Sequence, residues 1–500
     1  MSPTTAEILR EQMGRVTDVR SAVSLLQWDQ EVNMPPKGAE LRGRQLATLS
    51  AMAHRMFTDA EVGRVLERLA ADRQHLSDDD LALLDVCRYD FDRATRLPES
   101  FVHEFAQTTS QAYEAWVGAR KNNHFKTFQP WLQKVVDLCR RKADYMGYTG
   151  SPYNALLEEF ERGMTVETLK PLFADLAAKQ SALVERIKQS PNQPDTDWTE
   201  GTWDESAQWA LCLRALKQFG YDLDAGRQDK SVHPFSMALD MGDVRITTRI
   251  NPKELFSALT GTMHEAGHGL YSQGHDRADA FTPVADGPSL GIHESQSRMW
   301  ENLIGRSLPF WKWFTPILRE AYPGRLDSVT PETVYQAINA VAPSLIRVEA
   351  DECTYNLHVI LRFEIEVGLI EGTLKVADVP EAWNAKIKQY LGLDVPNDAQ
   401  GCLQDIHWSH GGIGYFPTYT LGNLYAAHLF ETIQADIPEL WSHVEKGEFK
   451  PLLDWLREKI HRIGRRKLTP DILREATGKE PTADAYLRYL NTKFGSLYKL

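Results

Sequence analysis

The apolar side chains along the first half of the chain recur with the spacing of α-helices. They return every three or four residues, and few stretches alternate as a strand would. The pattern predicts successive helices over residues 6–30, 40–57, 60–74, 77–95, 98–121, 128–147 and 165–189. Met34-Pro35-Pro36 separates the first helix from the second, because proline interrupts a helix. We therefore expect a mainly α protein.

The clearest β pattern lies in the stretch FSMALDMGDVRITTRI. It predicts two short strands around the turn Asp240-Met241-Gly242-Asp243. In the second strand, Val244 and Ile246 alternate with Arg245 and Thr247, which gives one apolar and one polar face. Two interpretations stay open. The strand is either an edge to which an extended peptide substrate adds, or part of an ordinary solvated ribbon.

Directly after this ribbon, residues 251–274 carry the features of one well-defined helix. Asn251 can cap its start, Pro252 suits its first position, and Glu254 completes a capping box. Gly274 is a suitable stop. The buried face is formed by Leu255, Leu259, Met263, Ala266 and Leu270. The sequence thus predicts a buried helix from 251 to 274.

Two histidines lie on an adjoining face of this predicted helix. His264 and His268 are four residues apart, so both imidazoles project from the same side. With Glu265 they form H-E-x-x-H, in which the histidines bind zinc and the glutamate is a general base. The alternative is a pair of helix histidines whose hydrogen bonds are satisfied without a metal.

A catalytic metal site needs a third protein ligand and a free position for water. The candidates downstream are His275, Asp286, His293, Glu294 and Glu301. Glu294 opens a second helical pattern, where it shares a face with Arg298 and Glu301. A carboxylate from a second helix is typical of thermolysin-like zinc peptidases, so we favour Glu294 over a simple ion pair with Arg298. Glu301 or His293 would then support the ligands from the outer shell.

Two later stretches add further candidates. Residues 344–370 show a long helical pattern, in which Arg347 and Asp351 have the spacing of a structural ion pair. After Pro396 follows an irregular, glycine-rich segment, and loops of this polar and aromatic kind carry function more often than they serve as linkers. It contains His407, His410, Tyr415 and Tyr419.

Composition excludes several classes of partner. The net charge of −13 argues against nucleic-acid binding. The N-terminus lacks an apolar signal core, and no apolar run reaches transmembrane length, so we expect no membrane association. The scattered cysteines, without a CxxC pair, indicate reduced packing residues in a cytoplasmic protein. They are Cys87, Cys139, Cys212, Cys353 and Cys402.

Six spaced motifs give the sequence a family resemblance. They are His233-Pro234-Phe235, Asp243-x-Arg245-x-Thr247, His264-Glu265-x-x-His268, His293-Glu294-Ser295-Gln296, Ile346-Arg347-x-x-Ala350-Asp351 and Gly401-x-x-Gln404-Asp405-x-His407-Trp408. Together with WDQEVNMPP near the start, they resemble the carboxypeptidase Taq family of zinc metallocarboxypeptidases. The similarity covers essentially the whole chain.

The resemblance implies a fold and an activity. The family is similar in architecture to angiotensin-converting enzyme and thimet oligopeptidase, with one large helical catalytic body and a deep substrate groove. Residues 1–500 would form this single domain, with an N-terminal helical lid within about 1–75. Members release single C-terminal amino acids from peptides with broad specificity, as homodimers that use one zinc ion, or cobalt, per chain.

The resemblance also implies residue roles. His264, His268 and Glu294 would bind the metal, and Glu265 would assist attack of the activated water. Arg347 would hold the substrate's terminal carboxylate, with Arg245 as a reserve and His233 as a further substrate contact. His407 and Tyr419 would stabilise the transition state, with Tyr415 as an alternative to Tyr419. Two rival functions remain: an endopeptidase or oligopeptidase with the same zinc chemistry, and a helical binding protein with an incidental H-E-x-x-H.

Overall fold

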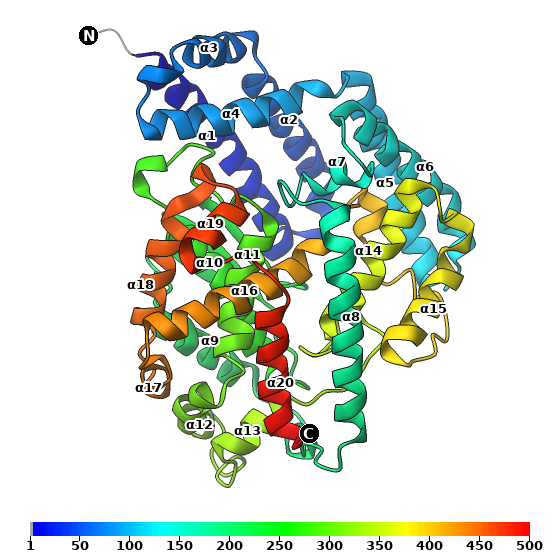
Figure 1. Cartoon of the computed structure of the whole chain (residues 1–500), viewed down its shortest axis with the longest axis vertical. Coiled ribbons are helices and arrows are strands. Elements are labelled where there is room, and N and C mark those ends of the chain that lie inside the picture. Colours follow the sequence, from blue (N-terminus) through cyan, green and yellow to red (C-terminus); the bar gives the residue numbers. More distant parts are fainter. Residues whose placement is uncertain (1–3) are drawn as a thin grey trace.

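A computed structural model describes residues 4–500, and it confirms the mainly α prediction (Figure 1). All seven helices predicted for the first half are present. This half contains α1 (Thr5–Val32), α2 (Ala39–Phe57), α3 (Ala60–Ala71), α4 (Asp78–Arg96), α5 (Glu99–Lys121), α6 (Phe125–Met146), the short α7 (Tyr153–Leu157) and α8 (Val166–Gln189). Periodicity located them well because each helix buries one face against its neighbours.

The second half supplies the centre of the molecule. It contains α9 (Glu205–Phe219), α10 (Ser257–Gln273), α11 (Leu290–Arg298), the π-helix η5 (Met299–Ile304), α12 (Leu308–Ala321), α13 (Pro331–Ile338), α14 (Tyr355–Glu371), α15 (Val379–Leu391), α16 (Pro417–Asp436), α17 (Leu440–Glu445), α18 (Lys450–Lys459), α19 (Thr469–Thr477) and α20 (Asp484–Tyr498). Helix α11 packs between α10 and α16. Within residues 4–500, no helix combines the length and the apolar character that crossing a bilayer requires.

The N-terminal helices have an apolar cluster of their own. In Figure 1, α1 to α4 lie together at one end of the molecule, next to the larger helical body. Leu9, Val65, Leu84 and Cys87 are fully or almost fully buried in this cluster, and Val284 joins it from the body. These helices therefore pack mainly on one another and form a segment beside the larger helical body.

The small sheet has three strands, one more than predicted. The hairpin of β2 (Ser236–Asp240) and β3 (Asp243–Thr248) is confirmed. Strand β1 (Gly226–Lys230) was missed because its sequence, GRQDK, is polar throughout and shows no alternation. It pairs with β3 in parallel, so β3 is central and both of its edges are occupied. The edge-strand interpretation of β3 is therefore wrong.

Helix α10 begins at Ser257, six residues later than predicted. Asn251 forms a local turn instead, in which its side-chain oxygen accepts a hydrogen bond from the Lys253 N–H (3.0 Å). The carbonyl of Pro252 accepts from the Trp203 N–H (2.8 Å), which ties this segment to the start of α9. Tertiary hydrogen bonds thus replace the predicted first turn. The helix ends at Gln273, and Gly274 follows it as predicted.

Residues 344–354 form no α-helix and contain only a single 3-10 turn at Arg347–Glu349, which corrects the long helix predicted from Ser344. Helix α14 begins only at Tyr355. The carboxylate of Asp351 accepts hydrogen bonds from the N–H groups of Cys353 (2.9 Å) and Thr354 (3.1 Å), so it organises the turn before the helix. The predicted ion pair between Arg347 and Asp351 is therefore wrong, and Arg347 pairs with Asp405 instead (3.1 Å).

The five cysteines are free and buried, as the scattered pattern predicted. Burial raises the pKa of the Cys87 thiol to about 12 and that of Cys212 to about 11. Since the thiolate is the reactive form, these side chains serve packing.

A buried carboxylate joins the first half of the chain to the start of α11. Glu161, which is 1% exposed, accepts hydrogen bonds from the Ser289 hydroxyl (2.9 Å), the Gly291 N–H (2.9 Å) and the Tyr425 hydroxyl (3.0 Å). Burial raises its pKa from 4.5 to about 7, although these hydrogen bonds oppose the change. The folded state therefore holds a proton there at a pH where the unfolded chain has lost it.

This proton makes stability depend on pH. The contribution of Glu161 to the free energy of unfolding is fully present below about pH 4.5. It is lost as the pH rises through about 7. The change in pKa corresponds to about 3 kcal/mol in the free energy of unfolding. We expect Glu161→Gln to remove this part of the pH slope, measured by urea unfolding at pH 5 and pH 7.5. An unchanged slope in the variant would contradict the assignment.

Candidate metal centre

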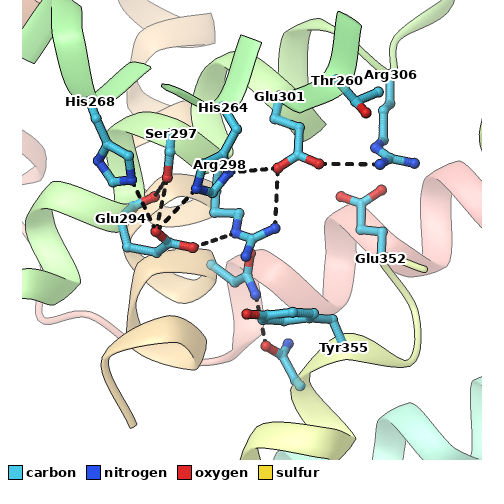
Figure 2. A network of polar contacts seen from close by, with 12 residues as sticks. Thr260, His264, His268, Glu294, Ser297, Arg298, Glu301, Arg306, Glu352 and Tyr355 are labelled. Atoms are coloured by element: carbon cyan, nitrogen blue, oxygen red, sulfur yellow. Dashed lines mark hydrogen bonds and ion pairs between the residues drawn. The ribbon is translucent and has the colours of Figure 1, made fainter. Parts of the chain in front are cut away.

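Two imidazoles and one carboxylate converge between α10 and α11 (Figure 2). The Oε2 atom of Glu294 lies 3.4 Å from Nε2 of His268 and 3.7 Å from Nε2 of His264. One donor atom from each residue lies within 4.8 Å of the others, and within residues 4–500 no other histidine, cysteine or acidic group meets this criterion. Imidazole nitrogen and carboxylate oxygen are donors that divalent transition metals accept. The donor set fits one such ion.

Two glycines allow the helices to approach closely enough to build this site. A Cβ atom on Gly267 of α10 would lie 2.4 Å from the carbonyl oxygen of Gln296 in α11. On the other side of α11, a Cβ on Gly422 of α16 would lie 2.4 Å from Cγ of Glu294. Glycine is therefore required at both positions, because a larger side chain at 267 would push against the backbone of α11 and one at 422 would displace the side chain of Glu294.

Each metal-facing histidine has a partner on its other nitrogen. Nδ1 of His264 lies 2.9 Å from Oε2 of Glu301, and Nδ1 of His268 lies 2.6 Å from Nδ1 of His293. Burial holds the pKa of His293 well below its usual range, so the neutral ring can accept the His268 proton. Both candidates for outer-shell support are thus in place, and both Nε2 atoms are left to face Glu294.

The other two candidate ligands are engaged elsewhere. Nδ1 of His275 lies 2.9 Å from the carbonyl oxygen of His461, and the carboxylate of Asp286 accepts from the Gly287 N–H (2.7 Å).

Arg298 lies between the two carboxylates of this centre. Its Nε donates to Oε1 of Glu294 (2.7 Å), and its NH1 group donates to Oε2 of Glu301 (3.2 Å). Burial opposes the ionisation of Glu294, but Arg298 and the two histidines outweigh it and keep the pKa of Glu294 below its usual range. Glu294 makes the predicted contact with Arg298 and also approaches the two imidazoles, because each contact uses a different oxygen.

Glu265 is the buried carboxylate beside this group. It is 6% exposed and follows His264 on α10. Burial raises its pKa, and the neighbouring histidines oppose the change. A carboxylate with a raised pKa is a better proton acceptor near neutral pH than an exposed one.

Three of the four residues named in the irregular segment gather in one group beside the candidate metal centre, whereas His410 stacks on the ring of Tyr113 (5.2 Å). The rings of His407 and Tyr415 are 5.3 Å apart, and Tyr415 lies 5.3 Å from Tyr419 on the first turn of α16. Burial raises the pKa of both phenols, and the charge of Glu294 contributes to each. The structure thus brings together three side chains that the sequence only placed within one loop.

Arg347 lies beside His407, Tyr415 and Tyr419 and completes a second group of candidate residues. Its guanidinium lies 5.1 Å from the centre of the Tyr419 ring and donates to the Tyr355 hydroxyl (3.0 Å) and to Asp405 (3.1 Å). Tyr355 was missed by the sequence analysis, although its ring also lies 4.5 Å from the guanidinium of Arg298. It starts a buried apolar helix, and nothing in its local pattern distinguishes it from core.

Arg245 and His233 lie outside these two groups. The guanidinium of Arg245 pairs with Asp243 (2.8 Å) and lies 4.4 Å from the ring centre of Trp28 in α1. His233 is exposed in the connection between β1 and β2. Arg245 therefore belongs to the contact between the sheet and α1.

A buried H-E-x-x-H helix that faces a carboxylate from a second helix, in a largely helical fold, is the architecture of a metal-dependent peptidase. The sequence profile of the carboxypeptidase Taq (M32) metallopeptidases matches residues 8–494. The chain belongs to this family and is a metal-dependent carboxypeptidase.

Individual relatives agree over the full length. The chain is 41% identical to the thermostable carboxypeptidase 1 of Thermus thermophilus over 511 residues, covering 100% of each chain. It is 39% identical to carboxypeptidase 1 of Bacillus subtilis, covering 97% of each. Among solved structures, the M32 carboxypeptidase from Deinococcus radiodurans R1 superposes with a TM-score of 0.98 at 41% identity, with 100% of each chain covered.

Proposed function

We propose that the chain releases single C-terminal residues from peptides with broad specificity, using one zinc ion held by His264, His268 and Glu294. The observation that carries this proposal is the convergence of these three donors within 4.8 Å. The same nitrogen and oxygen donors would also accept cobalt. A divalent ion held by these three residues would polarise the scissile carbonyl and lower the pKa of its bound water to about 7.

Glu265 serves as the general base of this reaction. Its carboxylate takes a proton from the attacking water and passes it to the amine of the departing residue. Its burial beside His264 supports the role, because the raised pKa brings the group closer to the operating pH.

His407 and Tyr419 donate hydrogen bonds to the oxyanion that develops on the carbonyl. Burial lowers the pKa of His407 to about 4, so its ring is neutral at neutral pH and carries one N–H donor. Tyr415, which contacts both side chains, is the alternative to Tyr419.

Removal of one such donor is expected to reduce kcat strongly. Tyr419→Phe should lower kcat by about 10²–10³-fold, equivalent to about 2.7–4 kcal/mol, with little change in KM. Tyr415→Phe is measured on the same N-blocked dipeptide. The variant with the larger loss in kcat identifies the phenol that donates to the oxyanion. A larger loss in Tyr415→Phe would transfer the role to that residue.

Arg347 binds the terminal carboxylate of the substrate, because a planar guanidinium can contact both carboxylate oxygens. Its position beside Tyr419 supports this role. Arg245 is the reserve for the same task, and His233 is a further proposed substrate contact from the sheet side.

The choice between exopeptidase and endopeptidase is tested by blocking each peptide end in turn. We expect cleavage of peptides blocked at the N-terminus and none of peptides amidated at the C-terminus. An endopeptidase or oligopeptidase would cut both, and internal fragments in the product mixture would support that rival. A binding protein with an incidental motif would cut neither.

We further propose a cytoplasmic homodimer in which the N-terminal helices form a lid over one catalytic body. The separate apolar cluster of α1 to α4 supports the lid. Size-exclusion chromatography with light scattering tests the dimer.

A further inference from the structure

The two oxygens of Glu294 have different surroundings (Figure 2). Oε2 accepts a hydrogen bond from the Ser297 hydroxyl at 3.1 Å and faces the Nε2 atoms of His268 and His264 at 3.4 and 3.7 Å. Oε1 instead accepts a hydrogen bond from Nε of Arg298 at 2.7 Å. The side chains of Glu294 and Arg298 are only 7% and 12% exposed, so water competes little for this contact.

The same guanidinium also holds the outer-shell partner of His264. NH1 of Arg298 donates to Oε2 of Glu301 (3.2 Å), the oxygen that contacts Nδ1 of His264 (2.9 Å). The second oxygen of Glu301 accepts from Arg306 (3.2 Å). Arg298 thus connects a metal-facing carboxylate with the group that orients a metal-facing imidazole.

The number of carboxylate oxygens that reach an ion decides how open the site is. A carboxylate can bind an ion through one oxygen or through both. A catalytic site needs positions free for water and for the substrate carbonyl. Because Arg298 holds Oε1, only Oε2 of Glu294 is directed to the ion.

We propose that Arg298 is a positioning residue that restricts Glu294 to one metal-binding oxygen and, through Glu301, fixes the orientation of His264. This inference rests on the proposed metal site. Without the guanidinium, Glu294 turns so that both oxygens face the ion, and a position needed by water or substrate is lost.

The role requires arginine and not merely a positive charge. A guanidinium presents Nε and NH1 in a fixed plane, so it can contact two carboxylates at once. A lysine ammonium is a compact point charge on a flexible stem and does not reproduce this geometry. Arg298→Lys therefore keeps the charge balance of the buried site and removes only the two-point contact.

The test uses the full-length protein loaded with Co²⁺, whose visible absorption spectrum reports the number and arrangement of its ligands. We expect Arg298→Lys to bind one Co²⁺ per chain with a changed spectrum, and its kcat to fall by about 10–100-fold. A spectrum identical to that of the wild type, with one ion bound, would overturn the inference. Failure of the wild type to bind a stoichiometric ion would instead refute the metal site itself.

Arg306→Lys is the matched control. Arg306 contacts Glu301 and the carbonyl of Ile338 but not Glu294, so Oε1 of Glu294 stays held by Arg298 and the cobalt spectrum should change less than in Arg298→Lys. An equal spectral change in this control would overturn the inference. If Arg298→Lys does not fold, the double variant Arg298→Met/Glu301→Gln removes one positive and one negative buried charge together, and the changed cobalt spectrum is expected there.

Discussion

Glu265→Gln is expected to lower kcat by about 10²–10⁴-fold while one metal ion per chain is retained. Glutamine has nearly the same shape as glutamate but cannot accept a proton. The side chain lies beside the metal-facing histidines without being one of the three converging donors. The loss should therefore fall on kcat, measured on an N-blocked dipeptide, and metal content should be unchanged by elemental analysis.

Glu254→Gln is a suitable control for this result. Glu254 is an exposed carboxylate just before the same helix, where it accepts from the Asn251 side chain (2.8 Å). This control should keep normal turnover. Wild-type activity in Glu265→Gln would end the general-base assignment.

Arg347→Ala is expected to lower kcat/KM on peptides with a free C-terminus by about 10–150-fold. A hydrogen bond to a charged group contributes about 1.5–3 kcal/mol, and this contact disappears with the guanidinium. Asp405 keeps a charged partner in the variant, because Nε of Arg362 donates to its other oxygen (2.6 Å). The fold should therefore survive the substitution.

The readout that separates binding from folding is the preference for free over amidated peptides. This preference should nearly vanish in Arg347→Ala and persist in Arg245→Ala, since Arg245 is held by Asp243 and lies against Trp28. If instead Arg245→Ala loses the preference for free over amidated peptides, the substrate's terminal carboxylate is bound by Arg245 of the sheet and not by Arg347.

The sequence was sufficient for the parts of the fold that depend on local rules. Helical periodicity located α1 to α6 and α8, because each has one apolar face to bury. The spacing of His264 and His268 put both imidazoles on one side of α10, as found. Glu294 could be preferred as the third donor because its segment has a helical pattern separate from that of α10, although α11 begins earlier, at Leu290.

The predictions that the structure corrects concern residues whose partners lie far away in the chain. Strand β1 is polar and exists only because β3 pairs with it. Asn251 has the sequence of a helix cap, but the Trp203 N–H binds the next carbonyl and keeps that segment out of the helix. The four-residue spacing pairs Arg347 with Asp351, whereas the actual partner, Asp405, comes close only through the fold. Tyr355 carries no local signal at all.

The most direct test of the central claim is metal analysis of the purified protein, combined with product identification on one N-blocked peptide before and after treatment with a chelator. We predict one divalent ion per chain, release of the single C-terminal amino acid, loss of that activity with the ion, and recovery when zinc or cobalt is returned. Full activity in chelated protein that holds no ion would contradict the account.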